Sequence, residues 1–349
     1  MMKTYGSSFC KALAVFAVLV LSSTSTSTSA NEKDVADFYN GKTIQILVGY
    51  SAGGGYDAYA RTLARHFSKH MAGNPSVIAK NVPGAGSLVL MNQIANTLPQ
   101  DGTVFGAVNS GMAYEPLFGN DKAQFDVNEV NWIGNLNVEV ALGMARKDSG
   151  IEKLEDLKTK RMTMGSTGAG ANSNVIPRVL ASLFDLNINV IAGYPGANDV
   201  RLAMERGEVQ GIGTLLLSST KATAPEWLEE GSDYNVIYQV ADQRHPELPD
   251  VTLVSDLAKT ERERQTINLL IARLKMGRPY VAPPGIPQER VTALRNAMAE
   301  TVKDSEFLAD LKNQNLPVTF VPGDEMQGYF REVYQYPQDV VDVVKDAMK

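Results

Sequence analysis

The strongest chemical signal in the chain is a glycine-rich run, Gly49-Tyr50-Ser51-Ala52-Gly53-Gly54-Gly55-Tyr56-Asp57. A glycine-rich turn that leads into a helix directs several backbone N–H groups at one point, where the helix dipole also favours an anion. Such a turn binds a carboxylate or phosphate without a charged side chain. The same run contains Gly49-Tyr50-Ser51-Ala52-Gly53, which matches the G-x-S-x-G nucleophile elbow of hydrolases. The run therefore fits either an anion-binding loop or a catalytic serine.

A catalytic Ser51 needs a histidine base and an acid within reach. The chain has three histidines, His66, His70 and His245. The first two follow the glycine-rich run on the expected helix and point away from its N-terminus, and His245 lies in a turn bounded by prolines. We therefore prefer the anion-binding loop, expect no catalytic residue and no enzymatic activity, and keep a serine hydrolase using Ser51 as an alternative.

Motifs for metals and cofactors are incomplete. His66-Phe67-Ser68-Lys69-His70 places two histidines at helical spacing but lacks the glutamate of H-E-x-x-H. The chain has no G-x-x-x-x-G-K-[ST] motif, and its glycine-rich runs do not have the G-x-G-x-x-G spacing of dinucleotide sites. We expect neither a metal nor a cofactor.

Residues 165–173 form a second glycine-rich run, Gly165-Ser166-Thr167-Gly168-Ala169-Gly170-Ala171-Asn172-Ser173. Like the first, it lies between an expected strand and an expected helix. Two such loops in different α/β units predict a cleft in which helix N-termini face each other across a bound anion. This is the physical logic of periplasmic binding proteins.

The elements around these runs follow a parallel α/β pattern, in which short β-rich runs alternate with helical periodicity. The first run follows an expected strand at residues 43–48 and precedes a helix at 56–70, where Tyr59, Leu63 and Phe67 share one face. Near residues 132–145 two extended runs follow each other without a helix, which suits a crossing between domains. A return run at 236–240 indicates a second crossing, near residues 237–243.

These crossings predict two α/β domains joined by a hinge. Domain 1 is expected to comprise residues 31–136 plus 241–349, and domain 2 residues 137–240. The two glycine-rich runs then belong to different domains and face one cleft.

The first thirty residues predict export. Lys3 and Lys11 precede or flank a short apolar run at 12–21, and Thr28-Ser29-Ala30 offers a small-residue cleavage site. This pattern is typical of a signal peptide over residues 1–30, since the apolar run is short for a membrane span. An uncleaved membrane anchor is the alternative. The only cysteine, Cys10, lies in this segment, so a mature protein of about 319 residues would have no disulfide.

Charge limits the partners. Loss of Lys3 and Lys11 changes the formal net charge from −6 to −8, with 31 basic against 39 acidic residues. An acidic exported protein without a basic run is a poor candidate for nucleic acid or an anionic membrane. We expect a soluble periplasmic monomer that binds no nucleic acid.

Several short motifs together resemble one family, the Bug-type solute-binding receptors of tripartite tricarboxylate transporters. In chain order they are Gly53-Gly54 with Asp57 and Arg61, Asn81-Val82-Pro83-Gly84-Ala85-Gly86, Pro99-Gln100-Asp101-Gly102-Thr103, Tyr194-Pro195-Gly196 with Gly207-Glu208-Val209, Arg244-His245-Pro246-Glu247-Leu248-Pro249-Asp250, and Pro283-Pro284-Gly285-Ile286-Pro287. The resemblance covers essentially the whole mature chain. Each motif is weak alone, but their order and spacing are specific.

The resemblance implies a fold of two Rossmann-like α/β domains with a hinge, of the type II periplasmic-binding-protein (Venus flytrap) kind. It implies capture of a small organic acid (a di- or tricarboxylate, an aromatic acid or an acidic amino acid) and delivery to the permease subunits of the transporter. A periplasmic sensor subunit that reports a ligand to a signalling kinase is the alternative of another class.

The resemblance also implies the binding residues. Family receptors hold the ligand carboxylate with the loop after the first strand and a matching loop of the second domain. The expected ligand-binding residues are Ser51, Ala52, Gly53, Gly54, Tyr56, Asp57, Asn109, Ser110, Ser166, Thr167, Gly168, Ala169, Gly170, Asn172, Ser173 and Tyr194.

Two features of the first loop qualify this expectation. Asp57 and Arg61, four apart on a helix, favour a local ion pair that orients the loop. Tyr50-Ser51-Ala52 replaces a proline common in relatives, so Ser51 adds a hydroxyl.

Overall fold

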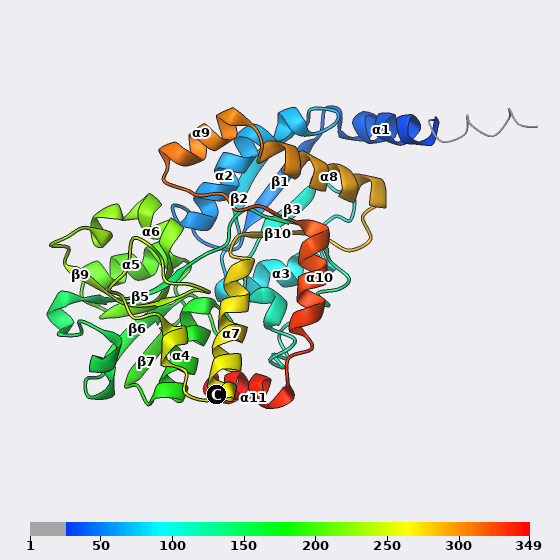
Figure 1. Cartoon of the computed structure of the whole chain (residues 1–349). Helices are drawn as coiled ribbons and strands as arrows, with labels where there is room; N and C mark the ends of the chain where they lie inside the picture. The colour runs from blue at the N-terminus through cyan, green and yellow to red at the C-terminus, as the bar shows by residue number, and fades with distance from the viewer. Residues whose placement is uncertain (1–25) are drawn as a thin grey trace, which may run out of the picture.

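The protein consists of two open sheets with helices packed on them (Figure 1). The computed structural model describes the backbone of residues 26–349 and the side chains from residue 32 onward. The helices are α1 (Thr26–Tyr39), α2 (Gly55–Phe67), α3 (Leu88–Asn96), α4 (Asn172–Phe184), α5 (Ala197–Glu205), α6 (Leu217–Thr223), α7 (Glu261–Lys275), α8 (Gln288–Thr301), α9 (Ser305–Asn313), α10 (Gly323–Val333) and α11 (Gln338–Ala347). The strands are β1 (Thr43–Val48), β2 (Ser76–Asn81), β3 (Val104–Ala107), β4 (Asn131–Asn135), β5 (Ala141–Arg146), β6 (Met162–Ser166), β7 (Ile188–Ala192), β8 (Gly211–Leu216), β9 (Tyr234–Val240), β10 (Pro279–Ala282) and β11 (Val321–Pro322).

The first sheet has the strand order β11-β4-β10-β3-β1-β2. Strands β2, β1 and β3 are parallel, and β10 runs antiparallel between β3 and β4. Helix α2 covers β1 and β2 with the face that the four-residue spacing predicts, since Tyr59, Leu63 and Phe67 are fully buried. We call this sheet and the helices on it the first lobe.

The second sheet has the order β7-β6-β8-β5-β9. It repeats the arrangement of the first: three parallel strands, β7, β6 and β8, are followed by an antiparallel strand, β5, which also pairs with β9. This sheet and its helices form the second lobe. The predicted fold class, two Rossmann-like α/β units, is confirmed.

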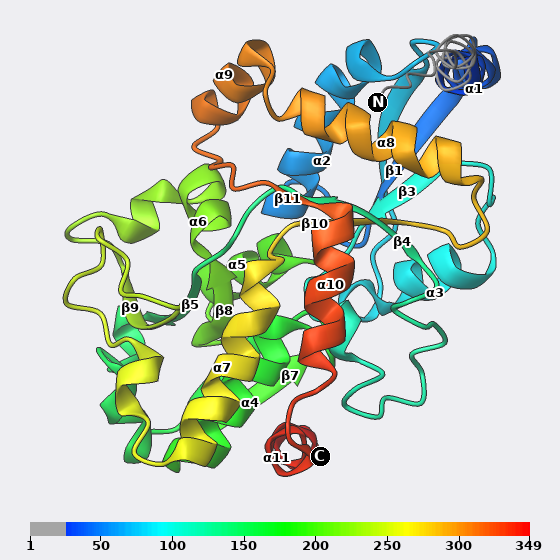
Figure 2. The same ribbon diagram turned by 45° about the vertical axis from the view of Figure 1, so that its right-hand side comes forward.

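The chain crosses between the lobes more often than the sequence predicts. After β4 it enters the second sheet at β5, as expected. Helix α7, however, lies along α4 of the second lobe before β10 returns to the first sheet, and the last helix, α11, also packs against α4 and α7 (Figure 2). The domain boundaries at residues 137 and 240 stay a prediction, and these contacts favour assigning α7 and α11 to the second lobe.

An extensive apolar core runs through the first lobe and continues beneath α4 of the second lobe. A second apolar cluster lies between β8, α5 and the 3-10 helix Pro225–Leu228, which contains Trp227. No helix within residues 26–349 has the length and apolar character needed to span a bilayer. The predicted signal peptide lies outside the described residues up to residue 25, and α1 begins at Thr26, before the predicted cleavage site.

Candidate functional site

One buried carboxylate braces the glycine-rich loop after β1. Asp57 accepts a hydrogen bond from the Gly53 N–H at 2.9 Å, and Asn81 and Arg61 also donate to it, at 2.8 and 2.9 Å. Burial alone raises the pKa of Asp57, but these hydrogen bonds outweigh burial and hold the pKa below its ordinary value. Gly53 has a φ of +84°, which favours glycine. The expected local ion pair between Asp57 and Arg61 is present.

Three helix N-termini, from both lobes, meet at one cavity. Helices α2, α4 and α5 begin after Gly54, Ala171 and Gly196, whose backbones are extended, and no side chain caps any of them. The first-turn N–H groups of a helix lack intrahelical partners, and each N-terminus carries the equivalent of about half a positive charge. Their convergence creates a site suited to an anion.

The cavity has a volume of about 50 Å³ and lies between the carboxyl ends of the parallel strands of the two sheets. Its first-lobe lining is Tyr50, Ser51, Gly54, Gly55, Tyr56 and Asn109. Its second-lobe lining is Thr167, Asn172, Ser173, Gly196, Ala197, Ile212, Thr214, Leu215, Leu216 and Ser219. The edge formed by the carboxyl ends of parallel strands is where ligands bind in open α/β sheets.

Seven of the sixteen expected binding residues line this cavity, with both glycine-rich loops represented: Ser51, Gly54, Tyr56, Asn109, Thr167, Asn172 and Ser173. Burial raises the pKa of both Tyr50 and Tyr56, so their hydroxyls remain protonated. Tyr56 donates to the Gly277 carbonyl, whereas the Tyr50 hydroxyl accepts a hydrogen bond from Asn109.

Four expected residues of the first lobe lie away from the cavity lining. Ala52 and Gly53 are exposed on the outer side of their loop, and Asp57 braces that loop from behind. Ser110 lies behind the cavity wall, where its hydroxyl accepts a hydrogen bond from Asn172 at 2.9 Å.

Five expected residues of the second lobe also lie outside the lining. Ser166 bonds to Ser173 (3.0 Å), and Ala169 is exposed with its carbonyl bound to Asn174. Gly168 and Gly170 pack against the first lobe. Tyr194 packs against the second apolar cluster.

The lobes touch across the cleft. Ser51 donates its hydroxyl hydrogen to Asp199 at 2.6 Å and its N–H to the Pro195 carbonyl at 3.2 Å. A side chain at Gly168 would collide with the backbone of Ala85 and Gly86 in the other lobe. The cleft is therefore closed in this structure.

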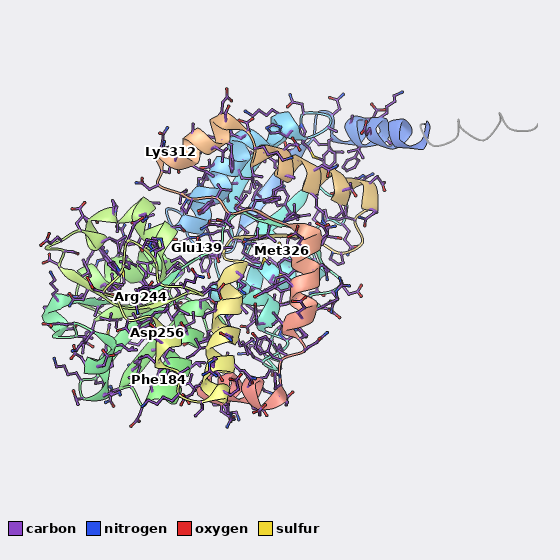
Figure 3. The ribbon with its side chains drawn as sticks, viewed as in Figure 1. Glu139, Phe184, Arg244, Asp256, Lys312 and Met326 are labelled. Carbon is purple, nitrogen blue, oxygen red and sulfur yellow. The ribbon has the colours of Figure 1, made fainter. Side chains whose placement is uncertain are left out.

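Two fully buried arginines support the cavity walls. The guanidinium of Arg278 pairs with Glu139 at 2.8 Å and donates to Ser218 and Ser219, at 2.6 and 2.8 Å. It lies over the rings of Tyr56 and Tyr59, so it stands directly behind two lining residues, Tyr56 and Ser219. Figure 3 places Glu139 centrally, where the lobes meet.

The second arginine, Arg273 of α7, holds the N-terminus of α4. It donates to the Asn172 side chain at 2.8 Å and to the Gly170 carbonyl at 2.6 Å. Its guanidinium lies over the rings of Tyr114 and Phe118 of the first lobe. Arg273 thus orients a lining residue and bridges the two lobes. An arginine inside the apolar run Leu269–Leu274 was a signal for this role, because unpaired arginines are rarely fully buried.

Nine lining residues escape prediction from the sequence: Tyr50, Gly55, Gly196, Ala197, Ile212, Thr214, Leu215, Leu216 and Ser219. A signal existed for Gly196 and Ala197, which belong to a third glycine-containing junction between a strand and a helix. No comparable signal marks the end of β8, because the run from Ile212 to Leu216 resembles an ordinary core strand.

The histidines lie away from Ser51. His66 and His70 of α2 bond to Asp310 and Asp304 at the α9 side, at 3.0 and 2.8 Å. The ligand atoms of His66, Asp304 and Glu306 lie within 4.8 Å of one another. The Lys69 ammonium already bridges Asp304 and Glu306, at 2.6 and 2.8 Å, so a cation of this chain already pairs with both carboxylates.

The sequence matches one protein-family model and several sequence relatives. The model of the tripartite tricarboxylate transporter family receptor matches residues 59–339. A UPF0065 protein of Bordetella pertussis is 24% identical over 288 residues, which cover 80% of this chain and 83% of that protein. A UPF0065 protein of Cupriavidus necator is 25% identical over 318 residues, which cover 89% and 86%.

Solved structures share the fold. The periplasmic binding protein BugD superimposes with a TM-score of 0.71 at 19% identity, covering 88% of this chain and 98% of its own. MatC of Rhodopseudomonas palustris, with bound malate, gives 0.66 at 17% identity, with coverage of 88% and 99%. An R. palustris protein with adipate gives 0.67 at 16% identity, with coverage of 87% and 97%.

Proposed function

Because the chain belongs to the tripartite tricarboxylate transporter receptor family, whose members are periplasmic solute-binding proteins, we propose that it captures a small organic acid between its lobes and delivers it to a membrane permease. Export through a signal peptide over residues 1–30 and a periplasmic location are part of this proposal. The ligand carboxylate occupies the cavity, and no chemical step follows binding.

The observation that carries the proposal is the meeting of the α2, α4 and α5 N-termini at one cavity. Three termini, each equivalent to about +0.5 charge, favour one carboxylate there. Tyr50, Asn109 and Asn172 also line the cavity with polar side chains. The malate and the adipate bound by two structures of the same fold are also small organic acids.

Closure connects binding to delivery. The contacts of Ser51 with Asp199 and Pro195 join loops of opposite lobes next to the cavity. A ligand that holds both lobes stabilises the closed form, and the surface formed on closure gives the permease a signal that the receptor is loaded.

Thermal unfolding tests the proposal. The exported protein is unfolded in denaturant, dialysed to remove any carried-over ligand, refolded and heated with a panel of monocarboxylates, di- and tricarboxylates, aromatic acids and acidic amino acids. A ligand at a hundred times its Kd adds about 2.7 kcal/mol of stability, so we expect at least one acid to raise the Tm by several degrees. If mass spectrometry shows ligand-free protein and no acid raises its Tm, the proposal is wrong.

A further inference from the structure

We propose that Arg273 of α7 is a positioning residue for the bound acid: it fixes the amide of Asn172 as a hydrogen-bond donor to the ligand and supplies a positive charge behind the N-terminus of α4. This inference rests on the proposed function, because it concerns the ligand of the same cavity. It assigns part of the affinity for an anion to a side chain outside the cavity lining.

Arg273 is a buried cation that no carboxylate of the protein contacts. Its side chain is fully buried, its Nε and Nη2 donate to Asn172 and to the Gly170 carbonyl, and its Nη1 has no hydrogen-bond partner among the described residues. Burial lowers the pKa of Arg273, but the ordinary value is so high that the guanidinium stays charged at neutral pH. An unpaired buried charge is costly, so an anion bound nearby is a favourable counter-charge.

The second buried arginine is already compensated. Arg278 pairs with Glu139 at 2.8 Å and also donates to Ser218 and Ser219. Its charge is therefore largely cancelled at the cavity, whereas the charge of Arg273 is not.

One buried acidic side chain of the first lobe, Glu115, lies against Gly170. A Cβ at Gly170 would lie 1.6 Å from its Oε1. Glu115 accepts a hydrogen bond from Asn120 through Oε2, and its Oε1 has no partner among the described residues, so the carboxylate does not pair with Arg273. Burial raises the pKa of Glu115, which favours its uncharged form. Glu115 therefore weakens the field of Arg273 without cancelling it.

The contacts of Asn172 determine which end of its amide is free for a ligand. Its Oδ1 accepts from Arg273 Nε at 2.8 Å, and its Nδ2 donates to the Ser110 hydroxyl of the first lobe at 2.9 Å. The opposite amide orientation would place an NH₂ group against the guanidinium, donor against donor. The second Nδ2 hydrogen is left for an acceptor in the cavity that Asn172 lines. A carboxylate, which only accepts hydrogen bonds, matches this donor.

Residues of the first lobe hold the guanidinium in place. It lies over the rings of Tyr114 and Phe118, 5.4 and 5.6 Å from their centroids. A side chain at Gly111, in the loop after β3, would place its Cβ 1.9 Å from Nη2 of Arg273. Glycine at this position leaves room for the arginine, so both lobes fix the position of the charge in the closed form.

A double-mutant cycle with Asn172→Asp tests the charge without any ligand. Asn172→Asp keeps the shape of the side chain and places a carboxylate next to Arg273. An acidic residue at the first position of α4 also gains from the helix dipole, but this gain is common to both backgrounds. We expect the Tm shift caused by Asn172→Asp to be several degrees more positive in the wild-type background than in Arg273→Gln. Equal shifts in the two backgrounds would overturn the proposal.

Calorimetric titration of the refolded protein with malate, citrate, adipate, benzoate and glutamate measures the effect on binding. For the acid that binds the wild type most tightly, we expect Arg273→Gln to weaken binding at least tenfold and Arg273→Lys, which retains a cation, to weaken it less. Arg264→Gln removes a charge from an exposed position of the same helix and should bind like the wild type. Unchanged affinity of Arg273→Gln would overturn the inference and leave the proposed function intact. If the wild type binds none of these acids, both fail.

Glu115→Gln keeps the test independent of the folding of the Arg273 variants. It keeps the shape of the side chain and removes only a negative charge beside Gly170. If Arg273 acts on the ligand through its charge, Glu115→Gln should tighten binding of the same acid several-fold at pH 8, where the wild-type carboxylate is ionised most fully. Equal or weaker binding would contradict the electrostatic role of Arg273.

Discussion

Ser51 donates its one hydroxyl hydrogen to Asp199, 2.6 Å away in the opposite lobe. This contact distinguishes between the two roles that the Gly49–Gly53 motif allowed for Ser51, a residue of an anion-binding loop and a catalytic nucleophile. A nucleophile needs its hydroxyl bonded to a base, but here the partner is a carboxylate at the start of α5, and the three histidines lie elsewhere. Ser51 acts between the lobes, as part of the contact that closes the cleft.

A double-mutant cycle at Ser51 and Asp199 tests this role. A hydrogen bond to a charged group contributes about 1.5–3 kcal/mol, so Ser51→Ala should raise the Kd for the bound acid roughly tenfold or more. Asp199→Ala should act similarly, and the double variant should lose no more than either single variant, because both remove one interaction. Titration calorimetry measures the four Kd values. Strictly additive losses would show that the two side chains act independently.

At the scale of elements, the loop after β1 depends on Asp57, whose pKa in the folded protein lies below its unfolded value of 3.8. Its stabilising effect is fully present above pH 3.8 and is lost as the pH falls through the lower folded value. We expect Asp57→Asn to lower the free energy of unfolding at pH 7 by about 1–3 kcal/mol. Denaturant unfolding of both proteins should show this difference shrinking below pH 3.8; a difference independent of pH would contradict the assignment.

Much of this arrangement follows from local sequence signals. Periodicity predicts α2 with an extension that the structure resolves into a short 3-10 turn at Ser68–His70. Both glycine-rich loops lie at the cavity, since a strand followed by glycines and a helix has few other geometries. Local sequence does not determine which side of each loop faces the cavity. Ala52 and Ala169 were therefore expected at the site, but both are exposed and lie outside the cavity lining.

Elements defined by distant contacts were missed. Strand β10 begins at a proline and has four residues, so its sequence resembles a loop, yet it lies inside the first sheet between β3 and β4. Helix α11 has buried Val340, Val341 and Val344, and β-branched residues favour strands. Helix α7 was expected in the first lobe because nothing local reveals that it packs on α4.

At the scale of the whole molecule, the account depends on two lobes that close on the ligand. The second lobe approaches the first at Gly168, which faces the backbone of Ala85 and Gly86. Gly168 does not have a positive φ, so its backbone accepts a side chain, and the three atoms nearest to a Cβ there all belong to Ala85 and Gly86 of the opposite lobe. Its neighbour Ala169 is exposed and provides a matched control.

Titration of Gly168→Val and Ala169→Val with the acid that most stabilises the wild-type protein tests the central claim most directly. The new side chain at residue 168 keeps the lobes apart, so we expect Gly168→Val to lose at least tenfold in affinity while its unfolding free energy stays near that of the wild type. Ala169→Val should bind like the wild type. Equal, undiminished binding by both variants would contradict a ligand held between the closed lobes.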